Sequence, residues 1–153
     1  MEKSPKARLD GFLATYSPEV AALGRAAHKK MRQLLPGSFE LVYDNYNALV
    51  IGFSPTERPS DAIFSIALYP RWVNLFFLDA GASLPDPHGL LKGSGKIVRG
   101  LRLESAADLD KPEVRALIAE ALARAEAPMD RTRRNQLVIR ADSARKRPRR
   151  PRA

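Results

Sequence analysis

The chain has 153 residues, of which 26 are lysine or arginine and 17 are aspartate or glutamate, giving a formal net charge of +9. Hydrophobic residues make up 44% of the sequence, which excludes wholesale disorder, and a chain of this length buries a core without disulfides or a structural metal. The absence of cysteine excludes disulfide frameworks, thiolate zinc sites, iron–sulfur ligation and cysteine nucleophiles, and the two histidines are too few for a three-histidine metal centre.

Two helices are predicted at the N-terminal end. The first lies near residues 7–14, where three apolar side chains share one side. The second begins at Ser17-Pro18-Glu19, since serine is a good N-cap, proline suits the first helical position, and an acid there interacts favourably with the helix dipole. Its apolar residues recur at spacings of three and four, which is typical of one buried stripe, and Pro36-Gly37 ends it. The stripe consists of Val20, Leu23, Ala27, Met31, Leu34 and Leu35.

The central part of the chain follows a strand pattern. Apolar residues alternate with other residues in two of its segments, at Phe64, Ile66 and Leu68 and again at Val73, Leu75 and Phe77. The two strands predicted here, at residues 62–69 and 72–78, are separated only by Pro70 and Arg71, so the link permits only an antiparallel hairpin. We predict five strands, at residues 39–43, 48–53, 62–69, 72–78 and 97–103.

A last helix is predicted after the strands. Asp110 is the expected N-cap, Glu113 completes a capping box, and the helix ends within residues 125–128. The resulting order of helices, clustered strands and a helix predicts an α+β fold. We expect two layers, in which an antiparallel sheet of five to six strands has helices packed on one of its faces.

The C-terminal segment carries the whole charge excess. Residues 131–153 contain ten basic residues and one acid, Asp142, whereas residues 1–130 contain 16 basic and 16 acidic residues. We therefore expect a neutral folded domain over residues 1–128 and a basic tail over 129–153. The Leu-Val-Ile run within residues 136–140 is interpreted as a short added strand or a docking segment. From Ser143 onward the arginine- and proline-rich composition predicts disorder.

Three parts of the sequence resemble the YdhG-like domain family. They are the opening of the second helix (Phe12, residues 16–20 and Leu23), the first strand with its turn (residues 40–43), and the glycine-containing segment of residues 92–97. The resemblance covers about residues 8–125. It implies a compact two-layer domain with an antiparallel sheet. Some family members have been described as frataxin-like iron chaperones, so the resemblance also implies iron binding as an alternative function.

The chain departs from the family at one turn. Many members carry Tyr-Gly-Met-Pro-Ala-Phe where this sequence has Tyr43 to Ala48, reading Tyr-Asp-Asn-Tyr-Asn-Ala. A function tied to the Gly-Met-Pro turn is therefore not expected here.

Two segments are candidates for binding an anionic ligand. Lys92, Gly93, Ser94, Gly95 and Lys96 combine flexible backbone amides with cations, as anion nests do, although the segment does not fit a P-loop because the first glycine and the following helix are missing. Alternatively, it is an ordinary glycine-rich connection. The second segment is Tyr43, Asn45 and Tyr46 with Asn47, which Tyr69, Arg71 and Trp72 of the next hairpin are expected to approach. Alternatively, its asparagines simply form the turn.

The sequence predicts no catalytic triad, no cofactor and no resident metal. Asp79, Asp86 and His88 are at most a weak metal set, because Asp86 before Pro87 fits a turn equally well.

Six basic residues of the tail are candidates for binding nucleic acid or another polyanion: Arg145, Lys146, Arg147, Arg149, Arg150 and Arg152. The segment lacks an aromatic side chain for base stacking, which favours non-specific electrostatic contact.

The predicted function is a non-enzymatic binding module for a small anionic ligand or a protein partner, with a polyanion-binding tail. Two alternatives remain at this point, a frataxin-like iron-binding chaperone and an enzyme without a recognisable motif. The longest apolar run, residues 72–78, is far shorter than the ~20 residues of a spanning helix, and no secretory h-region follows the N-terminus, so a cytoplasmic location is expected.

Overall fold

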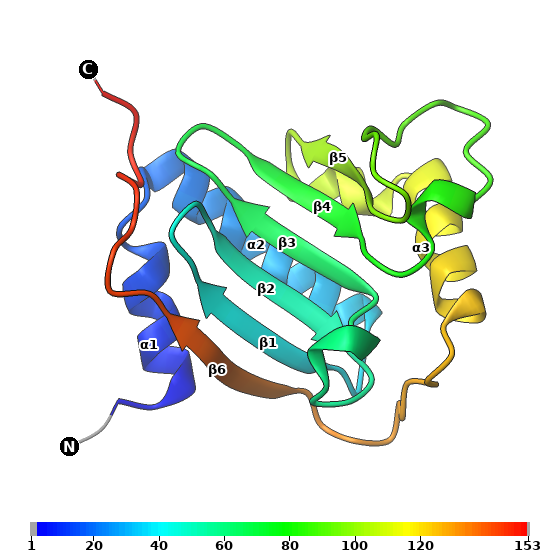
Figure 1. The fold of residues 1–153 in the computed structure, drawn as a ribbon, viewed down its shortest axis with the longest axis horizontal. Helices are drawn as coiled ribbons and strands as arrows, with labels where there is room; N and C mark the ends of the chain where they lie inside the picture. Colours follow the sequence, from blue (N-terminus) through cyan, green and yellow to red (C-terminus); the bar gives the residue numbers. More distant parts are fainter. Residues whose placement is uncertain (1–2, 153) are drawn as a thin grey trace.

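A computed structural model describes residues 3–152 of the chain. It contains three α-helices and six strands, shown in Figure 1. The helices are α1 (Pro5–Leu13), α2 (Pro18–Leu34) and α3 (Pro112–Arg124), and the strands are β1 (Phe39–Asp44), β2 (Leu49–Ser54), β3 (Phe64–Leu68), β4 (Val73–Phe77), β5 (Arg99–Leu103) and β6 (Gln136–Asp142). No helix among residues 3–152 is both long and apolar enough to cross a membrane.

The strands form one sheet in the order β5-β4-β3-β2-β1-β6. The predicted α+β class is confirmed, and so is the hairpin between β3 and β4, in which Leu68 pairs with Val73. The prediction of a purely antiparallel sheet is wrong at one edge, because β6 pairs with β1 in parallel. This parallel pair forms because the chain leaves α3, runs past the end of the sheet, and returns along the free edge of β1 (Figure 1).

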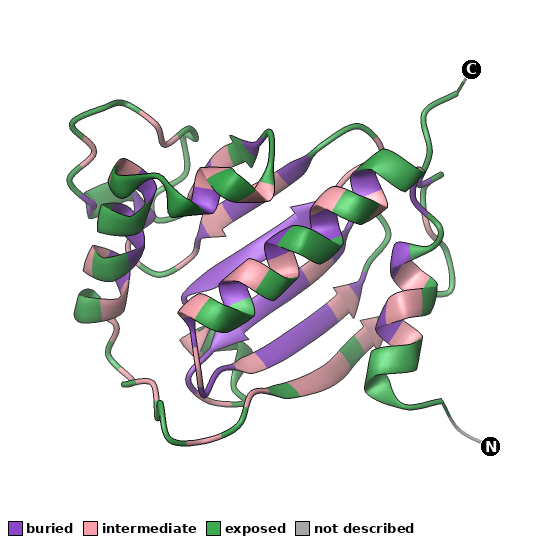
Figure 2. Cartoon of the chain, turned by 180° about the vertical axis from the view of Figure 1, so that it is seen from behind, coloured by how far each residue is buried: buried purple, intermediate pink, exposed green. Residues whose placement is uncertain are grey.

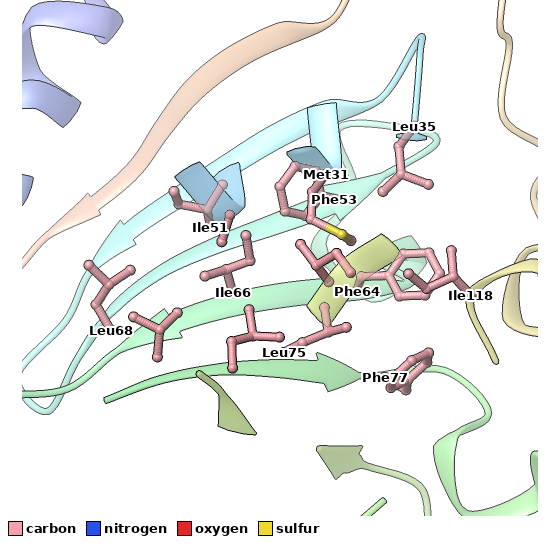
Figure 3. Packing of buried hydrophobic residues seen from close by; sticks show 14 of the residues in the cluster. Met31, Leu35, Ile51, Phe53, Phe64, Ile66, Leu68, Leu75, Phe77 and Ile118 are labelled. Atoms are coloured by element: carbon pink, nitrogen blue, oxygen red, sulfur yellow. The ribbon is translucent and has the colours of Figure 1, made fainter. Parts of the chain in front are cut away.

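The core lies between the sheet and α2, which crosses in front of the sheet in Figure 2, the view from behind. Alternate residues of the central strands point toward this helix, and Figure 3 shows Ile51, Ile66 and Leu75 among them. Gly24 sets the distance between the two layers, because a Cβ atom at that position would lie 2.5 Å from the Leu68 side chain. The opposite face of the sheet, toward the reader in Figure 1, has no α-helix over it within the described part of the chain, and only the short 3-10 turn Pro59–Asp61 lies at one end of it.

The N-cap of α2 is the one that the sequence predicts. Ser17 has an extended backbone and its hydroxyl accepts a hydrogen bond of 3.3 Å from the Val20 amide, with Pro18 at the first helical position. The predicted cap of α3 is wrong: Lys111 occupies the N-cap without a side-chain hydrogen bond, and Asp110 instead pairs with Arg115 and Lys30.

We expect Ser17→Ala to lower the free energy of unfolding by about 1 kcal/mol, because the Val20 amide loses its acceptor. Chemical denaturation measures this change. Ser94→Ala is the matched control, since Ser94 is exposed in a loop, and it should leave the stability unchanged. Equal stabilities of the two variants would contradict a capping role for Ser17.

The C-terminal segment is part of the folded structure: β6 corresponds to the short added strand expected within residues 136–140, whereas the disorder predicted from Ser143 onward is not observed. Strand β6 pairs with β1 along its length, with a register shift between Val42 and Tyr43. Beyond β6, Lys146 donates to one carboxylate oxygen of Asp44 at 2.6 Å and Arg149 to the other at 2.8 Å. The physical reason is Asp44 itself, a carboxylate 2% exposed at the end of β1, whose ion pairs within residues 3–152 are both with cations of this segment.

A candidate polyanion-binding surface on the open sheet face

The candidate site lies on the sheet face that has no helix over it. One row of paired residues crosses this face from β1 to β5, namely Tyr43, Val50, Ala67, Asn74 and Arg102. Four strand spacings separate Tyr43 from Arg102, which corresponds to about 19 Å. Glu40 and Val42, by contrast, point to the helical side, where Glu40 contacts α2. The row therefore lies on the open side, where Arg102 is exposed, Tyr43, Val50 and Asn74 are partly exposed, and Ala67 is buried between its neighbours.

An open depression of ≈ 520 Å³ lies at the β5 end of this face. The next row of the sheet extends beyond β5, because Lys92 and Gly100 exchange two backbone hydrogen bonds of 2.7 and 2.9 Å. Glycine is required at position 100, since the Phe76 ring would lie 2.6 Å from a Cβ atom there. The depression is lined by Asn74, Phe76, Lys92, Gly93, Gly100, Leu101 and Arg102.

The polar side chains of this depression have few partners among the described residues, and its two cations form no ion pair there. The Oδ1 atom of Asn74 is buried without a hydrogen bond, and the Lys92 ammonium contacts only the Gly89 carbonyl, at 3.2 Å. The Arg102 guanidinium stacks on the Trp72 ring at 4.2 Å from its centroid. A stacked guanidinium remains free to donate hydrogen bonds in its plane, so this arrangement suits a ligand that combines a flat ring with an anionic group.

A second open depression, of ≈ 490 Å³, lies at the turn end of the sheet. Asn47, Tyr69, Pro70, Arg147 and Pro148 line it, so the docked C-terminal segment forms one of its walls. Tyr46 is 44% exposed, and the Arg147 guanidinium lies 5.6 Å from its ring centroid.

Trp72 connects the two depressions. The centroid of its ring lies 6.4 Å from that of Tyr69, which lines the second depression. The Arg102 guanidinium, which lines the first depression, stacks on the same ring. We call the resulting set of residues the aromatic-cationic strip; it comprises Tyr46, Tyr69, Trp72, Lys92, Arg102 and Arg147. None of the ion pairs among the described residues uses a cation of the strip, and no acidic residue lines either depression.

The structure separates the predicted ligand-binding residues into several places. Lys92 and Gly93 line the first depression, whereas Ser94 and Gly95 lie outside it on an exposed loop. Lys96 lines a different shallow depression with Asp79 and Ser83. Because Lys92 lies beyond β5 and Tyr43 on β1, the two predicted segments share a sheet face but do not form one pocket.

The turn residues of the second predicted segment mainly bind the C-terminal segment. The carbonyl of Asn45 accepts a short hydrogen bond from Arg149, and the carbonyl of Tyr46 accepts from the Arg147 amide at 2.8 Å. Asn45 also closes the turn, since its amide donates to the Ala48 carbonyl at 3.0 Å. The contacts with the C-terminal segment use backbone atoms of Asn45 and Tyr46, and the Tyr46 and Asn47 side chains remain exposed.

The predicted tail cations divide into two groups. Lys146 and Arg149 are bound to Asp44, and Arg150 donates to the carbonyls of Ala14 and Thr15 at the end of α1. The other three, Arg145, Arg147 and Arg152, are exposed, and Arg147 contributes to the strip. Three of the six cations that the sequence assigns to polyanion binding thus contact the folded domain instead.

Sequence reasoning missed Arg102 and Asn74. They are neighbours only because β4 pairs with β5 across a long intervening loop, so their spacing in the chain carries no signal. The aromatic–cation pattern around Trp72 was partly visible, since Tyr69, Arg71 and Trp72 flank one hairpin.

A buried ion cluster lies on the other side of the sheet. Glu40 is 0% exposed and accepts hydrogen bonds from Arg32 at 2.7 and 2.8 Å, from His28 at 2.6 Å and from Asn135 at 3.0 Å. Burial alone would raise the pKa of Glu40, but the hydrogen bonds from His28, Arg32 and Asn135 outweigh it and lower the pKa to about 2. The carboxylate is therefore ionised at neutral pH and His28 donates to it through Nε2.

Comparison of the chain with family models, with curated proteins and with solved structures finds no match in any of the three. Membership of the YdhG-like family stays a prediction from the residues quoted above. Among residues 3–152, no three histidine, cysteine, aspartate or glutamate side chains are grouped so that they could hold a metal ion. The frataxin-like alternative thus rests on the resemblance alone.

Proposed function

We propose that the protein is a non-enzymatic binding module whose aromatic-cationic strip binds single-stranded nucleic acid. The observation that carries the proposal is the Arg102 guanidinium stacked on Trp72, beside the unpaired amide oxygen of Asn74. Bases stack on aromatic rings whatever their identity, and cations beside those rings bind the phosphates, which together make up the general chemistry of single-strand binding.

The geometry favours a single strand over a duplex. The rings of Tyr69 and Trp72 are tilted by 46° to each other and lie at the surface of a sheet, so they suit bases that have been unstacked from one another. A duplex keeps its bases stacked inside and offers only its backbone to such a surface. The small anionic ligand that the sequence predicts corresponds here to one nucleotide unit of the strand.

The cations set the expected salt dependence. Lys92, Arg102 and Arg147 are the three cations of the strip, and each is free to contact one phosphate. Neutralising three phosphates of a single strand predicts a slope of about −2 for the logarithm of the affinity against the logarithm of the salt concentration.

Trp72→Ala and Arg102→Gln are expected to weaken the binding of a fluorescent oligothymidylate of about ten nucleotides by about tenfold or more, because each removes a stacking or phosphate contact. Fluorescence anisotropy measures the affinities. Arg140→Gln is the matched control, since Arg140 is an exposed arginine on β6, outside the strip. It removes the same charge and should change the affinity far less.

Trp72 also provides an internal probe, because it is the only tryptophan in the sequence. Stacking of a base on its ring should quench its fluorescence during the titration. The proposal fails if the three variants bind alike, if a duplex binds as tightly as a single strand, or if binding leaves the tryptophan emission unchanged.

A further inference from the structure

A separate cavity of ≈ 210 Å³ lies between α1, α2 and β6, on the helical side of the molecule. Its apolar wall consists of Leu9 and Leu13 from α1 and Leu137 from β6. Its polar wall consists of Lys6, Asp10, Arg25, His28, Lys29 and Arg32. The four residues from α2 recur at spacings of three, one and three, which places them along one face of that helix.

The cavity has more positive than negative charge. Asp10 is the only carboxylate that residues 3–152 contribute to its lining, and it is shared by Arg25 at 2.9 Å and Lys6 at 3.4 Å. Arg32 is paired with Glu40 behind the wall. Counting lysine, arginine and carboxylate groups among the described residues, four cations face two carboxylates, Asp10 and Glu40, which leaves a surplus of two positive charges.

Lys29 is the cation that no protein group neutralises. It is exposed, and none of the ion pairs among residues 3–152 includes it. The neighbouring His28 is held in a fixed orientation by its hydrogen bond to Glu40. The Glu40 cluster therefore fixes two of the side chains that line the cavity, His28 and Arg32, before any ligand arrives.

We propose that this cavity is a binding site for a small phosphoryl dianion, either inorganic phosphate or the phosphate group of a small phosphomonoester. A surplus of two positive charges matches the charge of a phosphoryl dianion, and arginine and lysine are the side chains that donate to its oxygens. The volume is below the ~300–1,000 Å³ of sites for drug-sized molecules, which limits the ligand to a small one.

This inference is independent of nucleic-acid binding on the open face. Arg25, Lys29 and Arg32 belong to α2, which covers the rear of the sheet, whereas the aromatic-cationic strip lies on the front (Figures 1 and 2). Each site can thus be removed without the other.

The test is a titration of the ¹⁵N-labelled full-length protein with sodium phosphate at about pH 7.5, where the dianion predominates. Sodium chloride at the same ionic strength controls for screening. We expect saturable shifts in the amide resonances of residues 6–10, 25–32 and 136–138. Shifts that also occur in chloride, or that do not saturate, would overturn the proposal.

Two variants with opposite expected effects sharpen the test. Lys29→Gln should weaken phosphate binding about tenfold or more, since it removes a charged donor, whereas Asp10→Asn should tighten it by a similar factor because Lys6 and Arg25 are released. Both residues are at least partly exposed, so both variants should fold. Lys96→Gln is the matched control, and a phosphate affinity equal in all three variants would overturn the proposal.

Binding of phosphate and binding of the oligonucleotide should respond to different variants, which distinguishes the two sites. Lys29→Gln should leave oligothymidylate binding unchanged, and Arg102→Gln should leave the phosphate titration unchanged. A loss of oligonucleotide binding in Lys29→Gln would show instead that the basic lining serves the nucleic acid, and would overturn the assignment of the cavity to a small ligand.

Discussion

Replacing Glu40 with glutamine is expected to lower the free energy of unfolding by about 3 kcal/mol at neutral pH. The carboxylate is fully buried and all its contacts are donors, from Arg32, His28 and Asn135. Glutamine keeps the shape, but its amide group turns a donor toward these donors and leaves the Arg32 guanidinium without a counter-charge. Denaturation of Glu40→Gln against the exposed control Glu104→Gln measures the loss.

The same carboxylate makes stability depend on pH in a defined window. The pKa of Glu40 is about 2 in the folded protein and 4.5 for the unperturbed group, so the folded state binds fewer protons than the unfolded state between these values. The contribution of Glu40 is therefore fully present above about pH 4.5 and is lost as the pH falls to about 2. The shift corresponds to about 3 kcal/mol.

The pH dependence distinguishes the ionised cluster from simple packing. The stability gap between the wild-type protein and Glu40→Gln should shrink as the pH falls from about 4.5 to about 2, because protonation removes the same charge that the substitution removes. A gap that stays constant over this range would show that the loss comes from packing and not from the carboxylate charge.

Local patterns predicted the elements well, for reasons that the structure shows. The apolar spacing in residues 20–35 corresponds to the buried stripe of α2, and the alternation in residues 64–68 and 73–77 corresponds to the two central strands that face it. Burial on one side of an element fixes the period of its apolar residues, so the period alone identifies the element.

Glu40 shows where local patterns fail. It occupies an inward position of β1, where alternation predicts an apolar side chain, and it is tolerated there because His28 and Arg32 lie one helical turn apart on α2. A charged residue at an inward strand position, together with a His-x-x-x-Arg pair on the preceding helix, was the available signal.

The prediction of disorder for the C-terminal segment fails for a related reason. Arginine- and proline-rich composition predicts disorder because such a segment has little apolar area to bury. In this chain the segment is ordered by β6 pairing with β1 and by the buried carboxylate of Asp44, which lies about a hundred residues earlier in the sequence. Composition contains no information about such a distant partner. The same limit applies to the candidate site, where the pairing of β4 with β5 brings Arg102 beside Asn74.

Arg149→Ala is the variant that tests this docking most directly, and we expect it to lower the free energy of unfolding by about 3 kcal/mol. Arg149 is 7% exposed and donates to Asp44 and to the carbonyls of Asn45 and Tyr46, so its removal leaves a buried carboxylate with Lys146 as its only cation. Arg152→Ala is the matched control, because Arg152 is an exposed arginine three residues further along the chain.

Amide hydrogen exchange of residues 136–142 separates docking from any general loss of stability. In the wild-type protein the amides of β6 that are hydrogen-bonded to β1 should be protected, and in Arg149→Ala their protection should fall more than that of the β3 amides, because the anchor next to β6 is lost while the centre of the sheet remains. If Arg149→Ala and Arg152→Ala were equally stable and residues 136–142 were unprotected in the wild type, the segment would be a free basic arm. Arg147 would then no longer be fixed beside Tyr46, and only the β5 end of the aromatic-cationic strip would remain to bind a nucleic acid.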